Sequence, residues 1–288
     1  MTLKPGSRCE RKISQRPPHP DVRERIGIVT PTPRQEHPVT AVVLTLNEAT
    51  DIGPCLAAIP SDLPRIVVDS GSTDGTVELS KTAGARIYHR GWTGFADQRN
   101  FALLSCDIQT SWVLFIDADE RFSTAFFDWM RDVIRNDPPV DCYNVPSILF
   151  LDGKALRYAP GYPILHPRLV RRNVRFQVNH SGHGEAVVPC RNGLAPFGYD
   201  HYFQSGSLRP WLQKHLGLAK DEADSQAAPT SDRGRLARRI PAGAPRAILR
   251  FFYHYVARLG FLDGRNGFRY AVMYAWYELT IYLAGDRK

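Results

Sequence analysis

The feature of this sequence that most constrains its fold is a regular alternation of short apolar runs with helix-like segments. Short apolar runs rich in Val and Ile, bounded by Gly, Pro, Ser or Asp, are typical of buried strands. The predicted strands are TAVVLTL (40–46), RIVVDS (65–70), RIY (86–88) and WVLFI (112–116). Repetition of strand and helix with short loops predicts right-handed βαβ units and a mostly parallel sheet.

The segments between and after these strands carry helix signals. The predicted helices cover residues 51–59, 76–83, 95–106 and 124–135. Ser123 precedes the last of them, and Gly84 follows the second. Serine is a preferred residue at the start of a helix and glycine just beyond its end, so both positions support these boundaries.

After about residue 140 the pattern changes. Asp152-Gly153 and Asn192-Gly193 each lie between short β-like runs, which predicts two hairpins and therefore antiparallel strands. From Ser207 the chain is expected to be helical again. The fold class predicted from these signals is α/β, a mostly parallel sheet with antiparallel additions and a C-terminal helical segment.

Charge divides the chain into three regions. Residues 1–37 hold 8 Lys/Arg and 4 Asp/Glu, residues 38–206 hold 15 and 18, and residues 207–288 hold 14 and 7. The first region is rich in Pro and Arg without periodicity, so we expect a disordered basic tail. The second is expected to form the main domain, and the third a basic, aromatic helical region. Two explanations compete for the basic flanks: nucleic acid, or the anionic surface of a membrane.

Cysteine usage and hydropathy indicate the compartment. The five cysteines are scattered and form no CxxC pair, which is typical of reduced thiols in the cytoplasm and argues against a zinc site. The first 37 residues contain no apolar signal-peptide core, and no apolar run is long enough to span a bilayer. We therefore expect a cytoplasmic protein.

Polar clusters follow three of the predicted strands. Asn47 and Glu48 follow the first, Asp69 ends the second, and Asp117 and Asp119 follow the fourth. Ligands of open parallel sheets bind at the carboxyl ends of the strands, so these clusters are expected at one edge. Spaced i, i+2, the two carboxylates after the fourth strand point to the same side of an extended segment and repel unless a proton or cation lies between them. Mg²⁺ or Mn²⁺ suits such oxygen ligands and brings phosphate oxygens with it.

Asp69 is a second informative acid. It ends an apolar strand beside Gly71 and Gly75, which permit tight turns. A carboxylate there can accept hydrogen bonds from a ribose hydroxyl or a base N–H. The alternative is that Asp69 and Asp74 cap the helix that follows.

These clusters together resemble the inverting family 2 glycosyltransferases, which have a GT-A fold. The matching stretches are VVLTLNEATDIGPCLAAI, IVVDSGSTDGTVELSKTAGARIY, GFADQRNFAL and WVLFIDADE. A narrower resemblance, to bacterial lipopolysaccharide-core and exopolysaccharide enzymes, extends it to nearly the whole chain past residue 38. The stretches that carry the narrower resemblance are RLVRRNVRF, HGEAVV, DHYFQSGSLRPWLQKH and GFLDGRNGF.

The resemblance implies a role for each matching residue. Those expected to hold the nucleoside of a nucleotide sugar are Thr45, Asn47, Glu48 and Asp69, with Arg99 near the nucleotide. Asp117 and Asp119 match the DxD motif and are expected to hold Mg²⁺ or Mn²⁺ and the nucleotide sugar, with Asp119 favoured as the direct metal ligand.

Glu185 in HGEA matches a His-Glu motif of the narrower group and is expected to be the catalytic base. Here Gly184 separates it from His183, so either residue is a candidate for the base. An acceptor hydroxyl needs such a base, and in-line attack inverts the anomeric centre. The implied partners are a nucleotide sugar, with UDP favoured, and a saccharide or lipid-linked acceptor of bacterial cell-surface polysaccharide or lipopolysaccharide synthesis.

Other functions make different demands on the sequence. A nucleotidyltransferase needs a glycine-rich phosphate loop after the first strand, where this chain has LNEATD. A phosphatase of the haloacid-dehalogenase type places Asp-x-Asp near its first strand and follows it with Thr, which is absent from DADER. A non-catalytic scaffold in a polysaccharide assembly complex remains an alternative.

Arginines lie among aromatic residues in the C-terminal region, a composition typical of helices on anionic membranes. The expected partner is therefore the inner face of the cytoplasmic membrane rather than nucleic acid, for which no binding motif is present. The alternatives are packing of these aromatics on the sheet, or a dimer interface.

Overall fold

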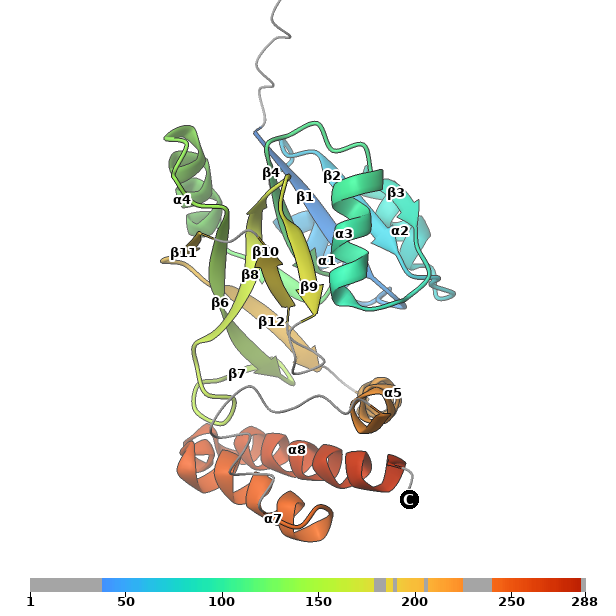
Figure 1. Ribbon diagram of the computed structural model, residues 1–288, viewed down its shortest axis with the longest axis vertical. Coiled ribbons are helices and arrows are strands. Elements are labelled where there is room, and N and C mark those ends of the chain that lie inside the picture. Colours follow the sequence, from blue (N-terminus) through green and yellow to red (C-terminus); the bar gives the residue numbers. More distant parts are fainter. Residues whose placement is uncertain (1–37, 179–184, 189–190, 205–206, 225–239, 286–288) are drawn as a thin grey trace, which may run out of the picture. The chain divides into compact units, whose positions relative to one another are not determined.

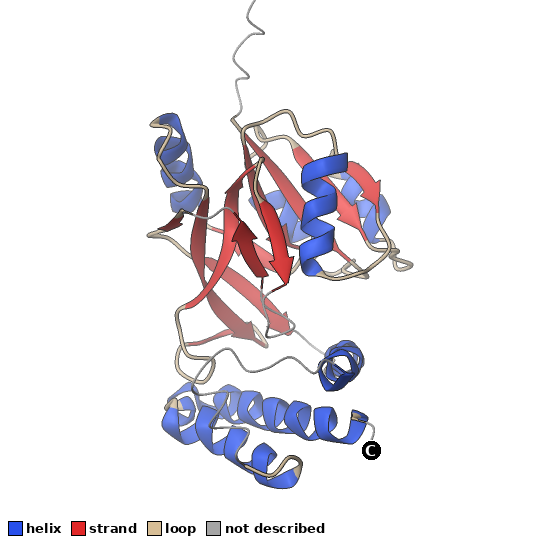
Figure 2. Ribbon diagram, viewed as in Figure 1, coloured by secondary structure: helices blue, strands red, loops and turns tan. Residues whose placement is uncertain are grey.

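The computed structural model describes residues 38–178, 185–188, 191–204, 207–224 and 240–285 (Figures 1 and 2). The predicted tail, residues 1–37, lies outside the described residues. Figure 2 shows helices and strands interleaved in the first part of the chain, strands dominating the middle, and helices at the end. The predicted α/β class is confirmed, with its antiparallel additions and its C-terminal helical segment. The predicted division at residue 206 stays a prediction.

The first half of the chain alternates strand and helix as the sequence predicts. Its elements are β1 (Val39–Thr45), α1 (Ile52–Ala58), β2 (Arg65–Asp69), α2 (Thr76–Thr82), β3 (Arg86–His89), α3 (Phe95–Ser105) and β4 (Trp112–Asp117). The strands are parallel in the order β3-β2-β1-β4. The chain order reverses between β1 and β4, and at such a switch point the loops leave a crevice for ligands.

Alternate residues of β1 pack on opposite faces of the sheet. Ala41 and Val43 belong to a core cluster that includes side chains of α1, whereas Val42 and Leu44 belong to a cluster with side chains of α3. This follows from the two-residue period of a strand. Burial on both faces explains why the apolar runs of β1 and β4 are uninterrupted.

The second half of the chain extends the sheet with mixed strands. Its elements are β5 (Glu120–Phe122), α4 (Thr124–Arg135), β6 (Cys142–Leu151), β7 (Lys154–Leu156), β8 (Ile164–Arg171), β9 (Arg175–Val178), β10 (Glu185–Val188), β11 (Asn192–Leu194) and β12 (Tyr199–Gln204). The sheet continues from β4 in the order β8-β6-β12-β5, and β8 is antiparallel to both of its neighbours. β9 and β10 form a separate antiparallel pair. The predicted cap of α4 is confirmed, because Phe126 N donates to Ser123 Oγ over 3.2 Å.

The two predicted hairpin turns have opposite outcomes. Asp152 and Gly153, with φ of 48° and 71°, join antiparallel β6 and β7 as expected. The second prediction is wrong, because Asn192 and Gly193 lie inside β11, which runs parallel to β6. Gly193 serves close packing there: a Cβ at this position would overlap the ring of Tyr143.

The C-terminal segment packs on the corner between β6 and β7. Its elements are α5 (Arg209–Asp224), α7 (Ala244–Phe252), the π-helical turn η2 (Tyr253–Ala257), the 3₁₀ turn η3 (Gly260–Asp263) and α8 (Gly264–Ala284). The Asp263 carboxylate accepts the backbone N–H groups of Arg157, Tyr158 and Ala159 over 2.8–2.9 Å. Asn266 Nδ2 donates to Leu151 O over 2.6 Å. Of the aromatics of this region, Tyr270 is buried in the interface, and Tyr274 and Trp276 are partly buried against it.

None of the helices in the described part of the chain combines the length and the apolar character needed to cross a membrane.

Candidate active site

Hydrogen bonds join the loops that follow β1 and β2 into one rim. Asn47 N donates to Ser72 Oγ, and Asn47 Oδ1 accepts from Thr73 N, each over 2.8 Å. Glu48 N donates to Thr76 Oγ1 over 2.9 Å. Asn47 has a φ of 55°, a left-handed conformation that asparagine tolerates better than most residues. The two predicted clusters are therefore adjacent at the carboxyl ends of their strands.

Asp69 organises the turn beneath this rim. Its side chain is buried, and Oδ2 accepts from Gly71 N over 3.0 Å and from Ser72 N over 3.1 Å. Thr45 lies beside it in register on β1, and the buried Thr45 hydroxyl has no hydrogen-bond partner among the described residues. Asp69 thus shapes the loop, and its contact with a nucleoside stays a prediction.

The alternative role of Asp74, like that of Asp69, is to cap the following helix, and the Asp74 side chain lies at the start of that helix, α2. Its Oδ1 accepts from Thr76 N over 3.2 Å, in the first turn of α2. Its Oδ2 accepts from Ala49 N over 3.1 Å, which adds another link between the two loops.

The charges at the end of β4 are balanced by two buried arginines. Asp117 Oδ1 accepts from Arg99 Nη2 over 3.2 Å, and Asp117 Oδ2 accepts from Arg168 Nη2 over 2.8 Å. Arg168 Nη2 also donates to Glu120 Oε1 over 2.6 Å, and Glu120 Oε2 accepts from Asp117 N over 3.0 Å. Two carboxylates and two guanidiniums therefore form one compact ionic cluster.

Burial and these cations act on the two carboxyl groups in opposite directions. Burial alone would raise the pKa of Asp117, but Arg168 and Arg99 hold it below its ordinary value. Burial raises the pKa of Glu120 to about 7 although Arg168 opposes it. Asp117 is therefore the more acidic of the two carboxyl groups.

Both arginines are buried. Arg99 is 1% exposed, and its guanidinium lies over the rings of Phe95, Phe115 and Phe176 at 5.6–5.8 Å. Arg168 is 3% exposed. Both act through Asp117, whose two oxygens they engage. Direct contact of Arg99 with a nucleotide stays a prediction.

Asp119 has a different partner, which the sequence reasoning missed. Asp119 Oδ2 lies 3.1 Å from His201 Nε2, and Asp119 O accepts from Tyr202 N over 2.8 Å. Pairing of β5 with β12 brings this histidine to the acidic cluster. Burial alone would raise the pKa of Asp119 and lower that of His201, but their mutual attraction reverses both shifts. The signal for His201 was its place in DHYFQSGS, a stretch that already carried the narrower resemblance.

Glu48 shares the field of Asp119. Burial, and then the nearby Asp119 charge, raise the pKa of Glu48 to about 7, while Lys214 of α5 opposes the shift. Glu48 therefore binds a proton more readily than an exposed glutamate does, whereas Asp119 binds one less readily than an exposed aspartate.

The side chains at Asp119 fit a divalent cation that takes some of its ligands from the protein and the others from a bound anion. The Asp119 carboxylate, in the turn between β4 and β5, is a suitable ligand for Mn²⁺ or Mg²⁺, and the imidazole of His201 on β12 lies beside it. No group of three metal-binding side chains occurs among the described residues, and oxygens of a bound anion can complete the shell. Phosphate oxygens commonly do so.

Glu185 begins β10, where it pairs with Val178 of β9. Its side chain, and all of His183, lie outside the described residues. The β9–β10 pair is fixed to α3 through Asn100: its Nδ2 donates to Phe176 O, and its Oδ1 accepts from Phe176 N, each over 2.8 Å. The strand that carries Glu185 is thereby tied to the helix that carries Arg99.

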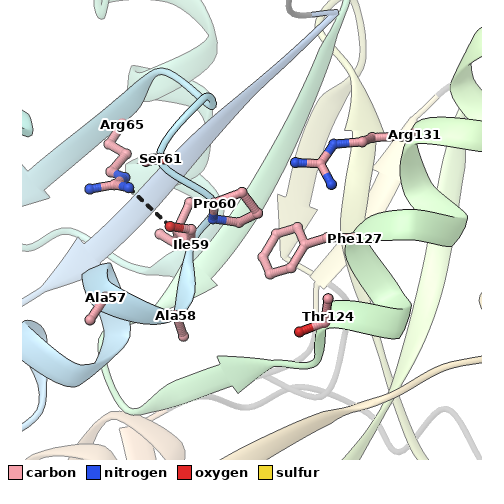
Figure 3. A pocket seen from close by; sticks show the side chains of 9 residues that line it. All are labelled: Ala57, Ala58, Ile59, Pro60, Ser61, Arg65, Thr124, Phe127 and Arg131. Atoms are coloured by element: carbon pink, nitrogen blue, oxygen red, sulfur yellow. Dashed lines mark hydrogen bonds between the residues drawn. The ribbon is translucent and has the colours of Figure 1, made fainter.

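A hollow of about 430 Å³ lies elsewhere, between the end of α1 and the start of α4 (Figure 3). Figure 3 shows Arg65, Phe127 and Arg131 around it, with Arg65 donating to Ile59 O. It includes none of the predicted site residues, and α1 and β2 place it at the amino ends of the parallel strands. Chemistry at the acidic edge therefore does not involve this hollow.

Comparisons of sequence place these observations beside known proteins. Residues 40–182 match the family described as glycosyl transferase family 2. The chain is 30% identical over 176 residues to the lipopolysaccharide core biosynthesis glycosyltransferase LpsC of Rhizobium meliloti, which covers 59% of this chain and 62% of LpsC. It is 36% identical over 127 residues to the uncharacterized glycosyltransferase RP128 of Rickettsia prowazekii, covering 42% and 43%. The chain thus spans less than two thirds of the length of these curated relatives.

Two solved structures are also similar in part. One is S. aureus TarS in complex with UDP-GlcNAc, with a TM-score of 0.44, 14% identity, and coverage of 86% of this chain and 83% of that chain. The other is glucosyl-3-phosphoglycerate synthase from Mycobacterium tuberculosis in complex with Mn²⁺, UDP and glucosyl-3-phosphoglycerate, with a TM-score of 0.33, 21% identity, and coverage of 39% and 44%. Both TM-scores are too low to carry a residue from those proteins to this chain.

Proposed function

Residues 40–182 belong to glycosyl transferase family 2, and we propose that this protein moves a sugar from a nucleotide sugar, with UDP as the nucleotide, to a saccharide or lipid-linked acceptor. The observation that carries the proposal is the Asp119–His201 pair beside Asp117, at the edge of the sheet where the strand order reverses between β1 and β4. The name of the R. meliloti relative supports a place in lipopolysaccharide core synthesis.

The loops after β1 and β2 provide the nucleoside site in this proposal. Thr45 offers a buried hydroxyl without a partner among the described residues, and Asn47 and Glu48 form the joined rim above Asp69. Because this rim is fixed by its own hydrogen bonds, it can receive a rigid base and ribose without reordering.

Asp119 and His201 are the side chains that would hold Mg²⁺ or Mn²⁺. The bound ion would neutralise the charge that develops on the departing nucleoside diphosphate. Asp117 orients the strand end through its arginines, and Asp119 O, bonded to Tyr202 N, keeps the carboxylate next to His201. Asp117 as a second ligand is the less favoured assignment, since both of its oxygens accept hydrogen bonds from arginine.

Glu185 is the proposed base for the acceptor hydroxyl. A hydroxyl has a pKa far above 7, so it needs a carboxylate within hydrogen-bond reach as it attacks C1 of the sugar. Attack opposite the leaving group turns an α-linked donor into a β-glycoside. The bonds between Asn100 and Phe176 would hold the strand that carries this base.

A thermal-shift panel tests the donor and the metal together. A nucleotide sugar that binds the folded state raises the unfolding midpoint by mass action, so the true donor with Mn²⁺ should raise it and EDTA should reverse the rise. No shift with any nucleotide sugar, with or without metal, would contradict the proposal.

Asp119→Asn tests the metal role. Loss of a metal ligand removes several kcal/mol of charge stabilisation, so transfer and slow hydrolysis of the donor should fall by about a hundredfold or more. Asp128→Asn is the matched control, since this carboxylate is exposed on α4. A scaffold would show no metal-dependent hydrolysis in either variant or in the wild type, and a nucleotidyltransferase would release pyrophosphate from a nucleoside triphosphate.

A further inference from the structure

Exposed apolar side chains are concentrated in the C-terminal segment. Half of the exposed large hydrophobic side chains among the described residues lie between residues 248 and 283. Single exposed apolar residues need no explanation, but a contiguous patch of them marks an interaction surface. The position of these side chains on their helices therefore matters.

The side chains form one stripe along α7 and η2. Ile248, Phe252, Val256 and Leu259 follow one another at intervals of three or four residues, and Ile248 and Phe252 are 57% and 52% exposed. Residues at this spacing share one side of a helix. The opposite side carries Ala247 and His254, which are buried.

Ring contacts of residues beside this stripe join α7 and η2 to the neighbouring elements. Phe251 lies 5.6 Å from Phe268 of α8, and Tyr255 lies 6.4 Å from Phe261 of η3, measured between ring centroids. Figure 1 shows α7 lying alongside α8. We call the resulting surface the apolar face, and its members are Ile248, Leu249, Phe252, Val256, Leu259, Phe261, Leu262 and Phe268.

The charge around the apolar face is positive because the carboxylates of this segment are already engaged by backbone N–H groups and by arginines. Between residues 240 and 285 the only carboxylates are Asp263 and Glu278. Asp263 binds three backbone N–H groups, and Glu278 pairs with Arg250 over 2.9 Å and Arg246 over 3.7 Å. Arg265 is exposed and has no carboxylate partner within the described part of the chain.

We propose that the apolar face inserts into the headgroup and acyl-chain boundary of an anionic lipid bilayer, with α7 lying in the plane of the membrane. Aliphatic and aromatic side chains bordered by arginine are the combination that such a surface binds. Two copies of the face would instead bring like charges together, which disfavours a dimer through it. The proposal goes beyond sugar transfer and does not depend on it.

Sedimentation of the full chain with vesicles tests the proposal. Vesicles of phosphatidylcholine with phosphatidylglycerol should bind the protein, binding should fall as salt rises, and pure phosphatidylcholine vesicles should bind it at least about tenfold more weakly. Absence of binding to the anionic vesicles, or equal binding to both kinds, overturns the proposal.

The double variant Phe252→Asn/Val256→Asn locates the contact. It should reduce binding to anionic vesicles by about tenfold or more, because two partly exposed apolar side chains no longer enter the lipid. Leu104 on α3 is also a strongly exposed apolar side chain, so Leu104→Asn is the matched control and should bind as the wild type does. The double variant should keep the unfolding midpoint of the wild type and its rate of donor hydrolysis in vesicle-free buffer, so failure here is separate from failure of the proposed function.

Two further outcomes decide against the proposal. If the double variant binds vesicles as tightly as the wild type, the apolar face is not the contact. If sedimentation velocity shows a dimeric wild type and a monomeric double variant while neither binds vesicles, the face joins two copies of this chain.

Arg265→Glu should weaken binding to the anionic vesicles and leave the binding to phosphatidylcholine unchanged.

Discussion

The ionic cluster at the end of β4 shows how single side chains offset the repulsion among neighbouring carboxylates. Asp117, Asp119 and Glu120 crowd one strand end, and repulsion requires something positive nearby. Arg99 and Arg168 supply part of it, and His201 supplies the rest. The need for a counter-charge was predictable from the sequence, but the identity of its source was not.

Arg168→Met should destabilise the protein by about 3–5 kcal/mol, because it leaves the buried Glu120 and Asp117 with less positive charge. The double variant Glu120→Gln/Arg168→Met should cost less than the two single changes added together, since each single change strands the other partner. Urea unfolding of the four proteins measures this coupling.

Arg131 is partly exposed and pairs with Asp62 on the surface, so it provides the control for the buried arginine. Arg131→Met should change the free energy of unfolding by less than about 1 kcal/mol. Simple additivity for Glu120 and Arg168 would show that the buried contacts contribute nothing beyond packing.

Strand β11 shows how a turn signal can be overridden by packing. Gly193→Ala should destabilise the protein by about 1–3 kcal/mol, because the new methyl group meets the Tyr143 ring, which is itself held between Trp112 and Trp129. Gly217→Ala in α5 is the opposite case, since no atom lies within 4 Å of the added Cβ. It should be neutral or stabilise by up to about 1 kcal/mol. Equal effects of the two changes in urea unfolding would contradict this account of β11.

The η2 turn contains a buried histidine whose protonation opposes folding. Burial lowers the pKa of His254 from 6.5 to about 4, and Nδ1 lies 2.9 Å from Ala159 O, so the neutral ring donates to this carbonyl. Because the folded state binds the proton less readily than the unfolded state, the contribution of this group is complete above pH 6.5. It is lost progressively as the pH falls toward 4, by about 3 kcal/mol at 1.36 kcal/mol per pKa unit.

The free energy of unfolding, measured in urea at pH 7 and pH 4.5, checks the role of His254. His254→Gln keeps a donor for the carbonyl but cannot be protonated, so its stability should fall less between the two pH values than that of the wild type. Identical pH dependence of the two proteins would mean that His254 does not titrate in this range.

The C-terminal segment and the sheet depend on each other for stability. Asp263→Ala should destabilise the protein by about 2 kcal/mol, because three backbone N–H groups lose a charged acceptor. Asp128→Ala, at an exposed position of α4, should have little effect. Removal of residues 240–288 should destabilise the rest of the chain more severely, since it uncovers Leu151 and Leu156. A truncated protein with the unfolding midpoint of the wild type would show that the segment is an independent unit.

Local signals predicted the elements near the start of the chain and failed where distant segments pair. The strands β1 to β4, the Ser123 cap and the Asp152-Gly153 turn follow from patterns within a few residues. Insertion of β8 between β4 and β6, and the pairing of β5 with β12, depend on contacts across many tens of residues. Hence the acidic half of the candidate site was predictable, whereas the contributions of Arg168 and His201 were not.

Pairing of Asp119 with His201 has a consequence for the newly made chain. The two residues are 82 positions apart, and the strand that delivers the histidine is the last of the sheet to be synthesised. On a ribosome, the first four strands and their helices can collapse while β12 is still inside the exit tunnel. A nascent chain at that stage carries Asp119 without His201, so the metal site of the proposed function would form only after β12 has left the tunnel.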